Sequence, residues 1–115
     1  MPTIETLGGP SKRRTFAYDG TTTDGVVLQH GVPIRIEPEL FDAIRREFSG
    51  RTIPLGTSRT NPPPGGLGAW LARYSKSVNR RALTSGHASF VAAILVHEGL
   101  ARAHLEGTKV LLQFD

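Results

Sequence analysis

The spacing of hydrophobic and polar positions changes several times along this chain, and each change predicts a different element. From Glu37 to Gly50 the apolar residues stand at 40, 41, 44 and 48, which is the spacing of one helical face. Pro38 suits the first turn of a helix, and Gly50 suits its end, because glycine readily adopts the left-handed conformation that closes many helices. The pattern therefore predicts a helix over 37–50.

The residues before this helix favour short strands. Runs over 15–18, 26–29 and 32–36 are rich in β-branched and aromatic residues, and two Asp-Gly pairs between the first two runs favour turns. We expect a small antiparallel hairpin or meander over 15–36. It forms a sheet of its own or extends a sheet built from later strands.

The first 14 residues show no such periodicity. Gly8, Gly9 and Pro10 interrupt any pattern, and the basic run at 12–14 is shorter than the blocks of about five or six like charges that mark interaction tails. We predict a flexible, solvated arm over 1–14, with an arm that touches phosphate as the alternative.

Helical and extended patterns then alternate. RTIPLG at 51–56 reads as a short edge strand, because Pro54 cannot donate a hydrogen bond to a neighbouring strand. LGAWLARY at 67–74 reads as a short helix with Leu67, Trp70, Leu71 and Tyr74 on one face, so Trp70 is expected in the core. The polar and basic segment 75–86 is ambiguous.

The last third of the chain predicts a helix followed by a hairpin. The helix covers 87–99 and ends at Gly99, and two strands at 100–105 and 108–114 flank a Glu-Gly turn. The core face of this helix is expected to hold Phe90, Val91, Ile94 and Leu95. The outer face is expected to expose His87, Ser89, Ala92, Ala93, Val96 and His97.

The loop TSRTNPPPGGLGAW at 57–70 combines three prolines with three glycines. The prolines restrict three backbone angles, and the glycines allow close approach of backbone segments. A rigid strut that fixes the start of the 67–74 helix is the structural interpretation. The functional alternative is an anion-binding lip formed by Arg59, Thr60 and Asn61.

Together these elements predict one small α+β domain over 15–115, with three helices and a short antiparallel sheet. Over 37–115 the order is helix, strand, helix, helix, strand, strand, and its most specific part is FVAAILVHEGLARAHLEGTKVLLQF at 90–114. This order resembles a winged helix-turn-helix domain. The resemblance implies that 87–99 is the second helix of the motif, that Gly99-Leu100 is its exit, and that the hairpin is the wing.

The resemblance implies DNA binding, and the charge distribution bears on its mode. The formal net charge is +4, and residues 66–115 hold six basic and three acidic groups. The 87–99 helix has no Arg, Lys, Asn or Gln to read base edges, so contact with phosphates is expected instead. The candidate nucleic-acid-binding residues are Lys76, Arg80, Arg81, His87, Ser89, Arg102 and Lys109.

Several other classes of chemistry lack their sequence signals. There is no cysteine, no glycine-rich phosphate loop and no nucleophile elbow, and His97-Glu98 lacks the second histidine of a zinc protease motif. We expect no enzymatic activity, no cofactor and no metal site. No apolar run approaches the roughly 20 residues that cross a bilayer, and the N-terminus does not resemble a signal peptide, so we expect a cytoplasmic protein without a membrane partner.

Two hypotheses for function remain. The first is a small basic DNA-binding regulatory or accessory protein that forms a homodimer. The second is a non-enzymatic adaptor that binds a protein or sequesters an anionic ligand, such as an accessory protein of a phage or mobile element. Small apolar residues at Ala92, Ala93 and Val96 favour the second, because an exposed surface of this kind suits packing against another chain.

Overall fold

The computed structural model describes residues 3–6, 15–29, 33–57, 60–107 and 109–115. The elements in chain order are β1 (Thr3–Glu5), β2 (Thr15–Thr21), β3 (Gly25–Gln29), β4 (Ile34–Ile36), α1 (Pro38–Phe48), β5 (Thr52–Pro54), α2 (Leu67–Val78), the 3₁₀ turn η1 (Ser85–His87), α3 (Ala88–His97), β6 (Ala101–Glu106) and β7 (Lys109–Phe114).

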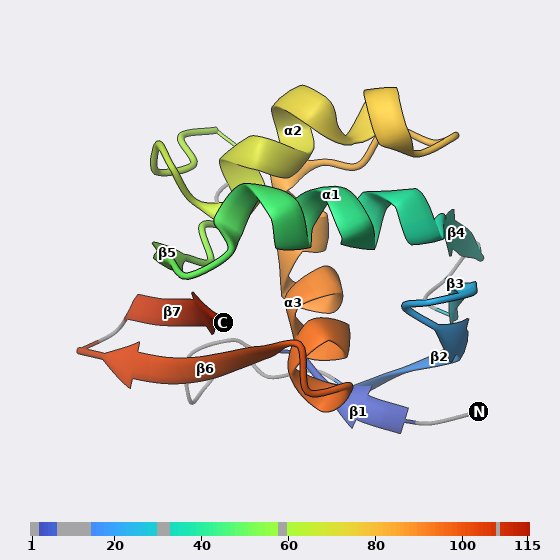
Figure 1. Cartoon of the computed structure of the whole chain (residues 1–115), viewed down its shortest axis with the longest axis horizontal. Coiled ribbons are helices and arrows are strands. Elements are labelled where there is room, and N and C mark those ends of the chain that lie inside the picture. The colour runs from blue at the N-terminus through green and yellow to red at the C-terminus, as the bar shows by residue number, and fades with distance from the viewer. Residues whose placement is uncertain (1–2, 7–14, 30–32, 58–59, 108) are drawn as a thin grey trace.

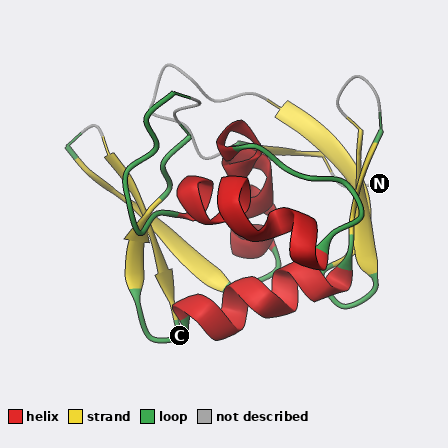
Figure 2. Ribbon diagram, turned by 90° about the horizontal axis from the view of Figure 1, so that it is seen from above, coloured by secondary structure: helices red, strands yellow, loops and turns green. Residues whose placement is uncertain are grey.

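Two antiparallel sheets flank the three helices, one on each side (Figures 1 and 2). The first has the strand order β1-β2-β3-β4, and the second has the order β5-β7-β6. The prediction of a small α+β domain with three helices is confirmed. Residues 15–36 do not extend the C-terminal sheet, because they pair among themselves and with β1.

The strand β1 corrects the prediction of a flexible arm for part of residues 1–14. Thr3–Glu5 pair with β2, with Ile4 opposite Phe16. A strand of three residues is too short to show a period, and it is held by backbone pairing and by one partly buried side chain, that of Ile4. Residues 1–2 and 7–14 lie outside the described part of the chain.

The helix α1 forms where its apolar spacing predicted, within two residues at each end. Glu39 lies in its first turn and Arg45 and Arg46 in its last, which opposes the helix dipole favourably at both ends. Its four buried side chains, Leu40, Phe41, Ile44 and Phe48, line the core.

The helix α2 begins in close contact with the backbone that follows β5. The N–H of Gly68 donates to the Leu55 carbonyl oxygen at 2.9 Å, and a Cβ at Gly68 would overlap the Gly56 carbonyl oxygen. Only glycine permits this approach, so Gly68 has a structural role. The core-facing side of α2 is Leu67, Leu71 and Ser75. Trp70, expected to be buried, is therefore only partly buried, and Tyr74 is 45% exposed.

The helix α3 lies between the two sheets (Figures 1 and 2) and is buried on nearly all sides. This burial follows from its composition, because a helix that is apolar all round has no solvent-facing side. Its buried residues are Ala88, Val91, Ala92, Ala93, Ile94 and Leu95. Side chains from both sheets and from α1 join it in one core.

Candidate nucleic-acid interface

The outer side of α2 and the segment after it carry four exposed basic residues. The helix continues to Val78, four residues beyond its predicted end, and this places Arg73 and Lys76 three positions apart on its solvent side. Arg80 and Arg81 follow directly and are also exposed. We call Arg73, Lys76, Arg80 and Arg81 the basic face.

None of the four members of the basic face forms an ion pair with a residue that the structure describes. The side chains of Lys76, Arg80 and Arg81 make no ion pair or hydrogen bond among those residues. They belong to the stretch 48–97, which has six Lys and Arg and no Asp or Glu. This acid-free stretch is a signal in the sequence, but the count of charges over residues 66–115 hides it because that range includes three acidic residues. The ion pairs within the described residues are elsewhere: Arg35–Glu37, Arg51–Glu47 and Arg102–Asp115.

The side chain of Asn79 fixes the backbone that carries Arg80 and Arg81. Asn79 is 4% exposed, and its Oδ1 accepts a hydrogen bond of 2.7 Å from the Glu37 N–H at the start of α1. Its Nδ2 donates to the carbonyl oxygens of Arg81 (2.7 Å) and Arg35 (3.3 Å). One buried amide therefore ties the end of α2 to β4 and α1.

A second buried polar side chain fastens the other end of the same turn. The Ser75 Oγ accepts from the Leu83 N–H at 2.8 Å and donates to the Leu83 carbonyl oxygen at 3.2 Å. Buried polar groups that are satisfied in this way hold a single backbone conformation. The segment 79–83 is thus held at both ends.

The structure does not place α3 where it could read bases. The expected exposure of Ala92 and Ala93 is wrong, whereas His97 is exposed as expected. Ala92 and Ala93 are 0% and 3% exposed, because α3 lies between the two sheets and is buried on nearly all sides (Figure 2). The Phe16 and Phe90 rings meet edge to face at 5.0 Å. The Tyr18 hydroxyl donates to the Glu98 carboxylate at 2.9 Å, just past the end of the helix.

Two of the candidate nucleic-acid-binding residues, His87 and Ser89, serve the start of this helix instead. The Nδ1 of His87 accepts from the Thr84 N–H at 2.9 Å, and the backbone N–H of His87 donates to the Thr84 carbonyl oxygen at 3.0 Å. The Ser89 hydroxyl lies 3.4 Å from the Gly86 carbonyl oxygen, at the limit of a hydrogen bond. Both residues are partly buried.

The remaining basic candidates lie apart from the basic face. Arg102 and Lys109 are exposed on the β6–β7 hairpin, whereas the end of α2 lies on the opposite side of the molecule (Figure 1). The Arg102 guanidinium is also paired with Asp115 at 2.9 Å. The predicted set therefore divides into two separate groups.

The proposed anion-binding lip is described only in part. Thr60 and Asn61 are exposed, and Arg59 lies outside the described residues. The lip therefore stays a prediction.

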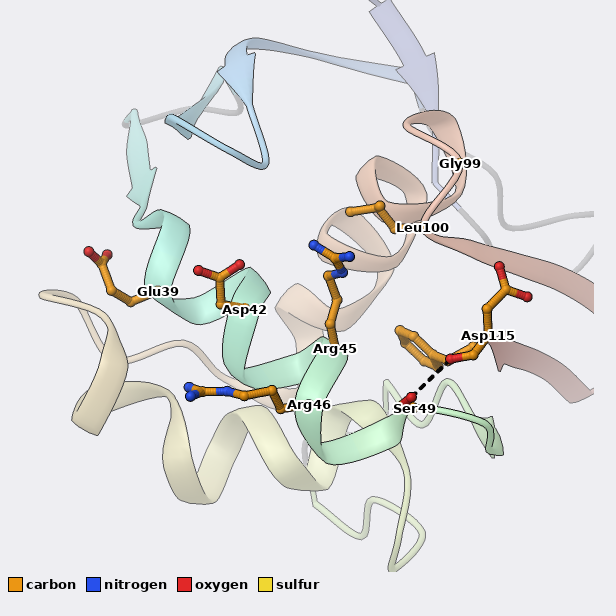
Figure 3. Close-up of a pocket in the computed structure, with 9 residues that line it drawn as sticks. Glu39, Asp42, Arg45, Arg46, Ser49, Gly99, Leu100 and Asp115 are labelled. Atoms are coloured by element: carbon orange, nitrogen blue, oxygen red, sulfur yellow. Dashed lines mark hydrogen bonds between the residues drawn. The ribbon is translucent and has the colours of Figure 1, made fainter.

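A cavity of about 750 Å³ lies beside α1, where that helix faces the α3–β6 turn (Figure 3). Arg45 points into it (Figure 3). Its apolar lining residues are Leu100 and Phe114. Glu39, Asp42 and Asp115 line it together with Arg45 and Arg46, so its charges largely compensate. It lacks the excess of positive charge that a phosphate site requires.

A second, smaller hollow of about 490 Å³ lies between α1 and α2, next to the basic face. It contains Tyr74, which the sequence pattern had assigned to the core. Tyr74 lies at the boundary between the buried face of α2, which holds Leu67 and Leu71, and the solvent face of that helix. The residues that line it are Ala43, Arg46, Glu47, Trp70, Tyr74 and Ser77.

Two other kinds of feature are absent from the part of the chain that the structure describes. Among the described residues, no group of three or more His, Asp or Glu side chains could hold a metal ion. None of the described helices has the length and apolarity needed to span a bilayer. A scan against protein-family models found no match, and neither a search of curated proteins nor one of solved structures found any.

Proposed function

We propose that this protein binds nucleic acid by contacting the phosphate backbone with the basic face of α2. The observation that carries this proposal is the group of exposed cations without carboxylate partners in the acid-free stretch 48–97. Such a surface binds a polyanion by displacing the counterions condensed on it, and it needs no contact with base edges. Duplex DNA is the expected target, in a regulatory or accessory role.

The resemblance to winged helix-turn-helix domains supports the same class of ligand. In helix-turn-helix proteins the second helix of the motif enters the major groove. Here that helix corresponds to α3, which is buried, so we infer binding with little sequence preference. The lack of cysteine supports a reducing, cytoplasmic setting, and a homodimer stays a prediction.

The adaptor hypothesis loses the observation that favoured it, because Ala92 and Ala93 are not on the surface. Val96 is also partly buried against the core. No other described surface favours a protein partner over a polyanion.

Fluorescence anisotropy with a labelled duplex of about 20 base pairs, at 50 and 200 mM salt, tests the proposal. Four phosphate contacts give a slope near −3.6 in log K against log salt, so binding should weaken roughly 150-fold over this range. The double variant Arg80→Ala/Arg81→Ala should reduce the slope to about −1.8.

A second double variant removes the same charge from the other side of the molecule. Arg102→Ala/Lys109→Ala also lowers the net charge by two, but it should keep the wild-type slope. Equal weakening by the two variants would show that net charge acts rather than the basic face. Binding that does not respond to salt, or no binding at 50 mM salt, would refute the proposal.

A further inference from the structure

The groove between α1 and α2 has an aromatic side that continues into the core. The rings of Phe114 and Phe48 are 5.7 Å apart, those of Phe48 and Trp70 are 6.2 Å apart, and those of Trp70 and Tyr74 are 5.9 Å apart. Phe114 and Phe48 are buried, Trp70 is partly buried and Tyr74 is 45% exposed. The row of rings therefore runs from the C-terminal sheet to the surface. The exposed ring of Tyr74 packs against rings that are themselves buried or partly buried.

The exposure of Tyr74 is unusual for this protein. Among the described large hydrophobic residues, only Tyr74 and Leu105 are exposed to this degree. Leu105 stands on the distant hairpin, whereas Tyr74 stands on the same helix as Arg73 and Lys76.

The charges around the ring are mainly positive. The Arg73 guanidinium lies 5.4 Å from the centre of the Tyr74 ring, and Arg46 lines the groove from the side of α1. The acidic residue of the groove, Glu47, is paired with Arg51 at 3.4 Å. A ligand in the groove would thus meet an aromatic surface beside cations.

We propose that this groove receives an unpaired nucleobase, so that the protein binds single-stranded nucleic acid in preference to a duplex. The inference rests on the proposed contact between the basic face and phosphates, and it replaces the expected duplex target with a single strand. Aromatic rings flanked by a basic track are the combination that single-strand-binding surfaces use, because every base has a face that can stack. The planar guanidinium of Arg73 offers a second stacking surface.

A duplex fits this surface less well. Its bases are already stacked on one another and paired, so it can offer phosphates to the basic face but no free base to Tyr74. Base stacking on an aromatic side chain changes affinity by roughly 5- to 150-fold when the ring is removed. A preference of that size for a single strand is expected.

The test compares labelled 15-mer oligothymidylate with a duplex that carries the same number of phosphates. Tyr74→Ala should weaken oligothymidylate binding by roughly 5- to 150-fold and leave duplex binding unchanged. Tyr74→Phe keeps a ring that can stack, so it should bind like the wild type. Because Tyr74 is half-exposed, Tyr74→Ala should remain folded, which circular dichroism checks.

The protein also contains its own reporter. Trp70 is the only tryptophan of the chain and adjoins Tyr74, so a base in the groove should quench its fluorescence, and the duplex should not. Salt-sensitive binding of both nucleic acids, unaffected by Tyr74→Ala and without quenching, would overturn this inference and leave the basic face standing. No binding of either nucleic acid at 50 mM salt would overturn both proposals.

Discussion

At the scale of single residues, Glu98 joins the N-terminal sheet to the central helix. Its carboxylate accepts hydrogen bonds from the Tyr18 hydroxyl (2.9 Å), the Thr22 N–H (2.9 Å) and the Thr22 hydroxyl (3.0 Å). A negative charge is unfavourable just after the C-terminus of a helix such as α3, because the helix dipole is negative there. Three charge-assisted hydrogen bonds offset this cost and hold β2 and the turn after it against the helix.

The phenol of Tyr18 makes this junction sensitive to alkaline pH. Burial raises the pKa of Tyr18 well above its usual range, and the hydrogen bond to Glu98 and its negative charge add to the effect. The folded state therefore keeps a proton that the unfolded chain loses near pH 10. The stabilisation is complete below that pH and is lost as the pH rises further.

We therefore predict that the free energy of unfolding falls above pH 10, by up to about 1.4 kcal/mol per pH unit from this group. Urea denaturation at a series of pH values between 8 and 11 measures it. Tyr18→Phe should lack this part of the slope, and the control Tyr74→Phe should keep it. A slope that is the same in wild type and Tyr18→Phe would contradict the assignment.

At the scale of elements, the sequence pattern predicts the presence of each helix better than it predicts which of its faces is exposed to solvent. The spacing in α1 identified both the helix and its buried face, because polar residues mark the other side. In α3 nearly every position is apolar, so the pattern predicts the helix but wrongly assigns Ala92 and Ala93 to an exposed face. The two sheets that enclose α3 (Figure 2) come from opposite ends of the chain, and their positions against it depend on contacts between residues far apart in the sequence.

The difference between local pattern and tertiary placement also explains which residues of the candidate site could be predicted from the sequence. Lys76, Arg80 and Arg81 were predicted from charge alone, which suffices for exposed residues. The distance of Arg102 and Lys109 from them follows from how the β5-β7-β6 sheet is placed, which no local pattern encodes. Tyr74 was missed because one turn of helix separates a core position from a boundary position.

A pair of substitutions tests the burial of α3 against the exposure of α2. Ala92→Arg places a charge in the core and should destabilise the fold by at least about 4 kcal/mol, which a small domain rarely tolerates. Ala72→Arg, on the exposed side of α2, should change stability by less than about 0.5 kcal/mol. It should also steepen the salt slope of nucleic-acid binding by about 0.9.

Thermal denaturation and the anisotropy titration measure the two effects. If Ala92→Arg remained folded and bound DNA more tightly, α3 would be accessible and the assignment of the interface would be wrong.

At the scale of the whole molecule, the two sheets share one core. Phe16 of β2 and Leu112 of β7 belong to the same buried cluster, with α3 between the sheets. Neither sheet can separate without exposing the apolar surface of that helix. Small domains built around one core unfold in a single cooperative transition.

We accordingly predict that urea unfolding followed by Trp70 fluorescence coincides with unfolding followed by far-ultraviolet circular dichroism. Glu98→Ala should lower the free energy of unfolding by about 2 kcal/mol and shift both curves together, since it acts on the junction of the two halves. The exposed Glu106→Ala is the control and should shift neither curve. A dichroism change that precedes the fluorescence change would mean that the N-terminal sheet unfolds separately.

The amide of Asn79 has a consequence for the thermodynamics of recognition. Because its hydrogen bonds already hold the backbone at Arg81 in the free protein, the chain there has little conformational entropy left to lose when a ligand arrives. The basic face is in this sense pre-organised, because on binding only its long side chains, and not the backbone that carries them, would lose conformational freedom. Recognition would then resemble the docking of a rigid, charged scaffold more than the folding of a segment onto its partner.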